Sequence, residues 1–223
     1  MNSRQRLSVA GVLVLLSAVV SALAWPELPA EMVTHWNAAG DPDGTMSKPL
    51  GLAFVPGITA LTVLLFLLIP RIDPLRENIT QFRAEYDWFI VVFTAYMTLV
   101  HAGVVAFNLG YEFDFLALVL VGLAGLFYYV GYLLDRAERN WFVGIRTPWT
   151  MSSETVWDRT QAFGARLFKA VAVLSLVGVL FGDLAIYFVV GPVLAVAAVT
   201  VIYSYWLYTR LEEGEAVSPE DIQ

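Results

Sequence analysis

A polar stretch near the start of the chain holds residue types that bind hard cations. In residues 26–50, His35, Asp41 and Asp43 could offer one imidazole nitrogen and two carboxylates to such an ion. The run Asp41-Pro42-Asp43-Gly44 is also an ordinary turn sequence, because Pro presets φ and Gly accepts positive φ. No second histidine or glutamate stands at a ligand spacing in this loop. We therefore favour a structured turn and predict no metal site.

The composition of the whole chain excludes most catalytic and metal chemistries. It has no cysteine and two histidines, which excludes thiolate nucleophiles, Cys-ligated metals and a closed zinc site. No nucleophile stands beside a base in a recognisable pattern. We therefore expect a protein that is not an enzyme and that uses no cofactor. The net charge of −7, without a basic patch, argues against nucleic-acid binding.

His101 is the one ionisable residue well inside a long apolar run. Ionisable residues at that depth are functional candidates by default, and His101 could serve a small-solute or proton transporter. A proton relay usually needs several such groups, and no charged partner lies at the same depth in another run. We favour a neutral His101 that is hydrogen-bonded near Asn108 or to a Ser or Thr on another helix. The small residues Ala102, Gly103 and Ala106 would permit the close helix approach that such bonds need.

An unusually long polar connector, residues 140–169, carries three of the seven tryptophans and four basic residues. Gly144 and Pro148 bracket Arg146, so the chain must turn there. Ser152 is a candidate N-cap, and apolar residues recur every three or four positions after it, which predicts an amphipathic helix at the membrane interface. The connector either braces the neighbouring helices or presents a docking surface in which Arg146 and the turn bind a partner or an anionic headgroup.

Apolar runs of membrane-spanning length make up most of the chain, which is 58% hydrophobic and 15% charged. About 20 apolar residues cross the hydrocarbon layer, so the last run is two spans with a reversal between Gly182 and Gly191. The first run could be a signal peptide with the cleavage pattern Ala22-Leu23-Ala24, but its length favours an uncleaved helix. We predict an all-α bundle of six transmembrane helices, from the apolar runs at residues 7–25, 51–69, 88–109, 115–134 and 170–209.

The distribution of Lys and Arg predicts the orientation of this bundle. Of the thirteen Lys and Arg residues, only Lys48 falls outside when the N-terminus is placed in the cytoplasm. Both termini are therefore predicted to be cytoplasmic, in a plasma-membrane protein in contact with lipid. We divide the chain into a two-span unit with a structured outer loop at residues 1–87, a four-span unit at residues 88–209 and an acidic cytoplasmic tail at residues 210–223.

Two motifs in these segments resemble those of a known family. In the connector, Gly-x-Arg-Thr-Pro-x-Thr followed by a Trp resembles the signature of the SdpI immunity-protein family. It is carried here by Gly144, Arg146, Thr147, Pro148, Thr150 and Trp157. The first outer loop resembles the domain of unknown function that commonly precedes this signature. Its matching residues are Pro29, His35, Trp36, Asn37, Gly40, Asp43 and Lys48.

The resemblance covers most of the chain and implies a six-span membrane protein without enzymatic activity. The founding member of the family protects its cell against a secreted antimicrobial peptide and draws a cytosolic repressor to the membrane. We therefore expect an immunity or signalling protein whose outer side senses a peptide toxin and whose connector engages a cytosolic regulator, through the residues of the two motifs. The alternatives are a transporter that uses His101 and a membrane enzyme or metal protein that uses His35, Asp41 and Asp43.

Overall fold

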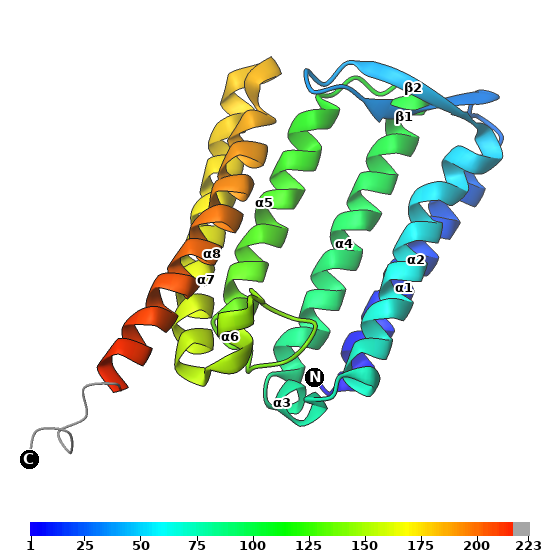
Figure 1. The fold of residues 1–223 in the computed structure, drawn as a ribbon. Helices are drawn as coiled ribbons and strands as arrows, with labels where there is room; N and C mark the ends of the chain where they lie inside the picture. Colours follow the sequence, from blue (N-terminus) through cyan, green and yellow to red (C-terminus); the bar gives the residue numbers. More distant parts are fainter. Residues whose placement is uncertain (216–223) are drawn as a thin grey trace, which may run out of the picture.

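The structure of the protein, a computed structural model, describes residues 1–215 and contains six helices long and apolar enough to span a membrane (Figure 1). These are α1 (Ser3–Ala24), α2 (Lys48–Ile72), α4 (Arg83–Asn108), α5 (Phe115–Leu134), α7 (Glu154–Gly178) and α8 (Tyr187–Glu215). The short helices α3 (Arg76–Gln81) and α6 (Pro148–Ser152) lie between them. The predicted six-span all-α bundle is confirmed. Most of the predicted acidic tail, residues 216–223, lies outside the described residues.

The helices α4 and α5 form the middle of the bundle (Figure 1). On one side α1 and α2 pack against α4, and on the other α7 packs against α5 and α8 packs against α7. The contact between α5 and α7 is close at Gly131, where a Cβ atom would lie 2.6 Å from the backbone oxygen of Ala165. Gly131 therefore permits the close approach of the two helices that flank the central connector.

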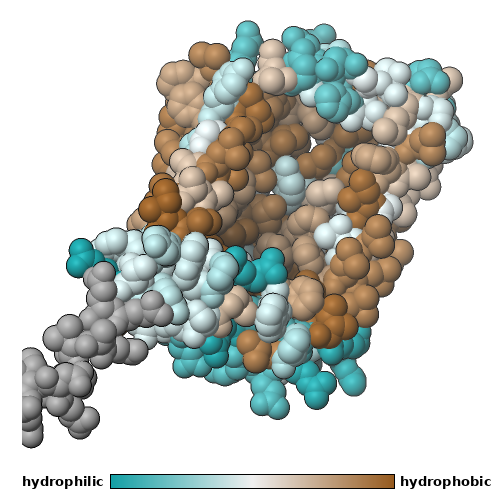
Figure 2. Space-filling view, viewed as in Figure 1, coloured by the Kyte–Doolittle hydropathy of each residue, from teal (hydrophilic) through white to brown (hydrophobic). Residues whose placement is uncertain are grey.

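A broad hydrophobic band separates two hydrophilic ends of the molecule (Figure 2). Large apolar side chains in this band, such as Leu61, Leu180 and Ile202, are more than half exposed. Exposed apolar surface of this extent marks contact with lipid, so the chain is a multi-pass membrane protein. We call the end that carries the β-strands the hairpin end. The opposite end, which carries residues 135–153 and the N-terminus, is the loop end (Figure 1).

The hairpin end is closed by two antiparallel strands, β1 (Glu31–Trp36) and β2 (Pro42–Ser47). The sequence indicates turns in this region, and these two strands were not predicted. Asn108, at the last position of α4, holds the hairpin through its side-chain amide. Its Oδ1 accepts from the Val33 N–H at 2.8 Å, and its Nδ2 donates to the Val33 carbonyl at 2.9 Å. The hairpin is therefore fixed across the end of the bundle.

The amphipathic segment after residue 153 differs from the prediction, because it is not a separate interfacial helix. It is the first half of α7, which continues without a break into the fifth span. The N-cap is Ser153, whose hydroxyl accepts from the Val156 N–H at 3.3 Å, and the predicted cap Ser152 is still in α6. No proline interrupts the segment, and α5 and α8 pack along it, so nothing turns the chain.

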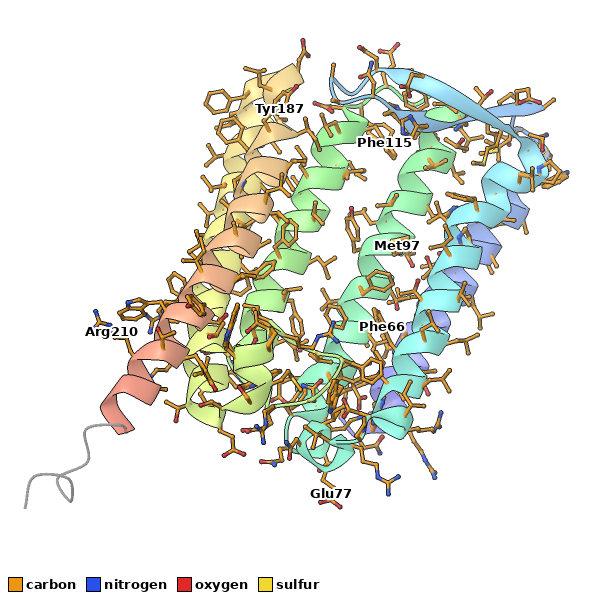
Figure 3. The ribbon with its side chains drawn as sticks, in the orientation of Figure 1. Phe66, Glu77, Met97, Phe115, Tyr187 and Arg210 are labelled. Carbon is orange, nitrogen blue, oxygen red and sulfur yellow. The ribbon has the colours of Figure 1, made fainter. Side chains whose placement is uncertain are left out.

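The reversal between the last two spans falls within the predicted interval. A 3₁₀ turn at Val179–Leu184 follows α7, and Gly182 in it has a φ of 54°, which a glycine adopts without strain. The chain then enters α8 at Tyr187, at the hairpin end of the molecule (Figure 3).

Candidate functional site

The predicted signature motif lies mainly in residues 135–153, the signature loop, which connects α5 to α7. The buried side chain of Asn140 folds the first part of this loop. Its Oδ1 accepts from the N–H groups of Phe142 at 2.8 Å and Val143 at 2.6 Å. Its Nδ2 donates to the carbonyls of Glu138 and Val143, each at 2.8 Å. One amide thus satisfies four backbone groups, which gives the loop a defined shape.

The signature loop is anchored to the N-terminal half of the chain. Asp73, which follows α2 and is 2% exposed, accepts from the Trp141 N–H at 2.9 Å through Oδ2. Its other oxygen accepts from the Leu75 N–H at 2.6 Å. The amide Nδ2 of Asn78, on α3, donates to the Arg139 carbonyl at 2.7 Å. These bonds fix the loop relative to α2 and α3.

Trp157 and Gln161, one turn apart on α7, hold the loop from the other side. The buried indole of Trp157 donates through Nε1 to the Ala137 carbonyl at 2.6 Å. The Gln161 amide bonds to both the N–H and the carbonyl of Ile145, each at 2.9 Å. Gly144 has a φ of 128°, and a Cβ there would lie 2.9 Å from Cη2 of Trp157. Two residues of the motif, Gly144 and Trp157, are therefore in direct contact.

Thr147 and Thr150 form a reciprocal cap at the start of α6. The Thr150 N–H donates to Oγ1 of Thr147 at 3.2 Å, and the Thr147 N–H donates to Oγ1 of Thr150 at 2.8 Å. The Thr147 hydroxyl also lies 3.1 Å from the Ser204 hydroxyl on α8. Pro148 is the first residue of α6, where a missing N–H costs nothing. The motif threonines thus tie the loop to the last span.

A second group of loop residues faces outward. Arg146 is exposed, and its guanidinium donates to the Trp141 carbonyl. A shallow groove of about 410 Å³ runs between Trp141, Arg146, Pro148 and Met151. The indole of Trp141 is 51% exposed beside it. The loop therefore presents an aromatic ring and a cation on a rigid, buried foundation.

Trp36 of the second predicted motif lies beneath the hairpin. Its indole stacks on Phe115 with ring centroids 3.7 Å apart and 14° between the planes, and it meets Phe107 edge-on at 5.2 Å. Figure 3 shows Phe115 at the end of α5, directly below the strands. Trp36 therefore docks the hairpin onto α4 and α5.

Asn37 and Gly40 build the turn between the two strands. The Asn37 Oδ1 accepts from the N–H groups of Ala39 at 2.9 Å and Asp41 at 3.0 Å. Gly40 has a φ of 91°, and a Cβ there would lie 3.3 Å from Cβ of Leu116. The structure of the turn therefore explains why an asparagine and a glycine stand at these two positions.

The charged residues of this motif lie on the surface of the hairpin end. His35 and Asp43 face each other across the strands, with Nδ1 and Oδ1 2.5 Å apart. Lys48 donates through Nζ to the Trp25 carbonyl at 3.1 Å. Within residues 1–215, no three His, Cys, Asp or Glu side chains are grouped so that they could hold a metal ion. The structure thus brings the residues of each motif together, but it places the two motifs at opposite ends of the bundle.

His101 has the type of partner that the sequence analysis favoured, a serine on another helix. It is 1% exposed, and its Nε2 lies 2.8 Å from the Ser21 hydroxyl on α1. That hydroxyl donates to the Ser17 carbonyl at 3.0 Å, so in a neutral ring Nε2 donates to Ser21. Asn108 instead holds the hairpin.

Sequence reasoning missed the polar residues that organise the signature loop, namely Asp73, Asn140 and Gln161. An asparagine near a turn often bonds the backbone two residues on, and this was the available signal for Asn140. Asp73 and Gln161 bond to backbone groups at Trp141 and Ile145, which are remote in sequence. The spacing of residues in the sequence does not predict such hydrogen-bond partners.

Comparisons with known proteins assign the two predicted motifs to two separate family matches. Residues 136–204 match the SdpI/YfhL protein family, and residues 12–60 match a domain of unknown function, DUF1648. The chain is 24% identical over 202 residues to the immunity protein SdpI of Bacillus subtilis (strain 168), which covers 90% of this chain and 94% of that protein. No solved structure matches. The chain is thus a six-span membrane protein that carries an SdpI/YfhL segment behind a DUF1648 segment, which confirms its resemblance to the SdpI immunity-protein family.

Proposed function

We propose that this protein protects the membrane of its own cell against a secreted antimicrobial peptide and recruits a cytosolic regulator when the peptide is present. The observation that carries the proposal is the similarity to an immunity protein along 90% of the chain. The site is built from hydrogen bonds and aromatic packing, without a grouped set of metal-type ligands in residues 1–215. Those features suit recognition of a partner.

The proposal places the hairpin end outside the cell and the loop end in the cytoplasm. Lys48 is the single Lys or Arg residue at the hairpin end, and the other twelve lie toward the loop end. An excess of Lys and Arg on cytoplasmic segments is the general rule for membrane proteins. In this orientation both ends of the described chain are cytoplasmic, in the plasma membrane.

The signature loop is the proposed docking surface for the regulator. Arg146, Trp141 and Pro148 line an open groove together with the mostly buried Thr147, while Thr150 and Trp157 are buried and do not line it. An exposed arginine beside an exposed tryptophan is the type of pair that carries binding energy at protein interfaces. The proposal gives Thr150 and Trp157 the role of holding this surface in place, without contact to the partner.

A survival assay tests the protective function. The full chain is expressed in a bacterium that is sensitive to membrane-active peptides, and cells are challenged with a panel of such peptides while membrane potential is recorded. We expect at least one peptide to require a severalfold higher dose to depolarise and kill the expressing cells. Equal killing with every peptide, in cells whose membranes contain the folded protein, would overturn the proposal.

A localisation assay tests recruitment. Each small DNA-binding protein of the host cell is fused to a fluorescent protein in turn, and one of them should move to the membrane when the protective peptide is added. Arg146→Ala should abolish that movement and leave survival unchanged. Arg159→Ala, an exposed change on α7 away from the groove, is the matched control and should have no effect.

A further inference from the structure

A hydrophobic cavity of about 360 Å³ lies below the hairpin, between α2, α4 and α5. Its walls are apolar side chains of these helices, among them Phe54, Val100, Val104 and Val119, and residues 34–38 of the hairpin roof it. Figure 2 shows the molecule hollowed in this region, with hydrophobic residues inside the hollow and hydrophilic residues above it. The cavity thus offers an apolar space directly beneath a polar surface.

A second, smaller pocket of about 210 Å³ adjoins the first and shares Trp36, Phe115 and Leu116 with it. Three aspartates line this second pocket, and they come from three separate elements. Asp41 belongs to the hairpin turn, Asp114 is the N-cap of α5, and Asp183 lies in the turn before α8. The fold therefore gathers carboxylates from three parts of the chain beside the apolar cavity.

None of the three aspartates forms an ion pair with another residue of the described chain. Asp114 uses one oxygen to accept from the Ala117 N–H at 2.8 Å, and Asp41 lies 3.4 Å from the Asn37 amide. The three do not form a group that could hold a metal ion. They are exposed, so a larger organic cation, such as an ammonium or guanidinium group, can reach them.

The charge of the surrounding surface favours the same type of ligand. The hairpin end carries one Lys, Lys48, which is occupied with Trp25. Its exposed carboxylates are Glu27, Glu31, Asp41, Asp43, Glu112, Asp114 and Asp183. Such an excess of one sign attracts the opposite charge over long range. Trp36 lines both pockets, and its buried Nε1 has no hydrogen-bond partner among residues 1–215.

We propose that the two pockets together bind a cationic amphipathic peptide. A Lys or Arg side chain of the peptide lies among Asp41, Asp114 and Asp183, and its neighbouring apolar side chains enter the cavity below Trp36. This inference rests on the proposed function, because it names the class of peptide against which the protein acts and the place where the peptide is bound. Complementary charge and complementary apolar surface recognise the two halves of the same ligand.

The test uses the purified full chain in nanodiscs of zwitterionic phosphatidylcholine, with empty nanodiscs as the reference. The probe is a fluorescent amphipathic helix of Lys and Leu, and a Glu/Leu helix of equal length is the comparison. We expect the Lys/Leu peptide to bind the protein more tightly than empty nanodiscs, with an affinity that falls as salt is added. The Glu/Leu peptide should show no such preference.

Two matched triple variants separate a specific site from general charge. Asp41→Asn/Asp114→Asn/Asp183→Asn removes the three pocket charges, and Asn keeps the N-cap of α5. We expect it to weaken Lys/Leu binding about tenfold, since three individually weak surface charge interactions are lost together. Glu27→Gln/Glu31→Gln/Glu112→Gln removes the same charge elsewhere and should weaken binding less than threefold. Equal losses in both variants would overturn the proposal.

Val119→Phe tests the apolar half, because it fills the cavity from α5. It should also weaken binding about tenfold, and Val100→Leu provides a milder change if the first variant does not fold.

Native mass spectrometry tests whether a lipid, and not a peptide, occupies the cavity. This measurement can show a phospholipid that stays bound to the protein and is lost in Val119→Phe. If the Lys/Leu peptide does not displace that phospholipid, a lipid occupies the cavity and the peptide site is refuted.

The binding and survival assays can fail separately. If the purified protein binds the Lys/Leu peptide as described but cells gain no survival with any peptide, the protective function is wrong and the site stands. If cells are protected and the triple Asp→Asn variant protects them equally well, the protective function stands and this site is wrong.

Discussion

The side-chain amide of Gln161 hydrogen-bonds to both backbone groups of Ile145, with the N–H to Oε1 and the Nε2 to carbonyl distances each at 2.9 Å. The amide provides one acceptor and one donor to backbone groups that need hydrogen-bond partners when buried. Gln161 is 2% exposed, and Ile145 precedes the exposed Arg146 of the groove. Gln161 therefore helps to fix the backbone next to the groove.

Gln161→Leu should loosen the signature loop, because it leaves the Ile145 N–H without its partner and the Ile145 carbonyl with the Thr150 hydroxyl as its remaining donor. A buried polar group that loses its partner costs about 1–3 kcal/mol. We expect a lower free energy of unfolding, by about 2 kcal/mol, and faster amide exchange in residues 140–147. Arg159→Leu, exposed on the same helix, is the control. Unchanged exchange in the loop of the Gln161 variant would show that other contacts suffice.

Gly144→Ala should destabilise the protein more than an alanine at another glycine. The φ of 128° is unfavourable for any residue with a Cβ, and that Cβ would lie 2.9 Å from Trp157. Strained backbone of this kind costs about 1–3 kcal/mol. Gly125→Ala, at a helical position with nothing within 4 Å of the added atom, should be neutral or stabilising. Thermal unfolding in detergent compares the two, and equal midpoints would contradict the expectation.

Single cysteines test the orientation directly, because the chain has none of its own. Ala38→Cys is exposed at the hairpin end, and Ser152→Cys is exposed at the loop end. A membrane-impermeant maleimide should label the first in intact cells and the second only after the membrane is opened. The reverse pattern would place the hairpin in the cytoplasm and would refute the proposed topology.

Asn108→Leu should free the hairpin from the bundle, because Val33 loses both bonds to the Asn108 side chain. We expect at least tenfold faster hydrogen exchange at the Val33 amide, which corresponds to about 1.4 kcal/mol of local opening. Exchange at the loop end should stay unchanged and serves as the internal control. Equal protection of Val33 in the variant would mean that strand pairing and Trp36 hold the hairpin alone.

The pair of Ser21 and His101 should show a modest energetic coupling. Hydrogen bonds between membrane helices contribute on average about 0.6 kcal/mol, and rarely above about 1.7 kcal/mol. A double-mutant cycle with Ser21→Ala and His101→Phe, measured by unfolding in detergent, should fall in that range. If His101 has a structural role, His101→Phe keeps the protection of cells. Loss of protection in a variant that folds normally would favour a transporter that uses His101.

The spans were predictable because apolar length alone decides which segments cross a membrane. The reversal at Gly182 and the serine partner of His101 followed from equally local arguments, namely a glycine between two apolar runs and the lack of a charged partner at that depth. The prediction for residues 153–169 was wrong about the helix boundary. The amphipathic pattern was real, but only the packing of α5 and α8 decides whether such a helix lies along the membrane or continues into it.

The two predicted motifs contained many of the residues that shape each end, but the sequence could not assign them roles. Thr150 and Arg146 stand four positions apart, and one is buried in a cap while the other is exposed beside the groove. Asp73 and Gln161 lie in other elements and hydrogen-bond to backbone groups of the loop. Every residue type has these backbone groups, so the sequence of the loop does not reveal the partners. The strands were missed because residues 42–47 contain Pro and Gly, which are typical of turns.

The uninterrupted course of α7 makes it a stiff rod of roughly 38 Å, at 1.5 Å per residue over 25 residues. Near one end of α7, Gln161 hydrogen-bonds to the signature loop. Beyond the other end, Asp183 lines the smaller pocket at the hairpin end, together with Asp41 and Asp114. Gly131 permits the close contact of this helix with α5. One continuous helix and a short 3₁₀ turn therefore connect the residue that binds Ile145 to Asp183, so the two ends of the molecule share a single structural element.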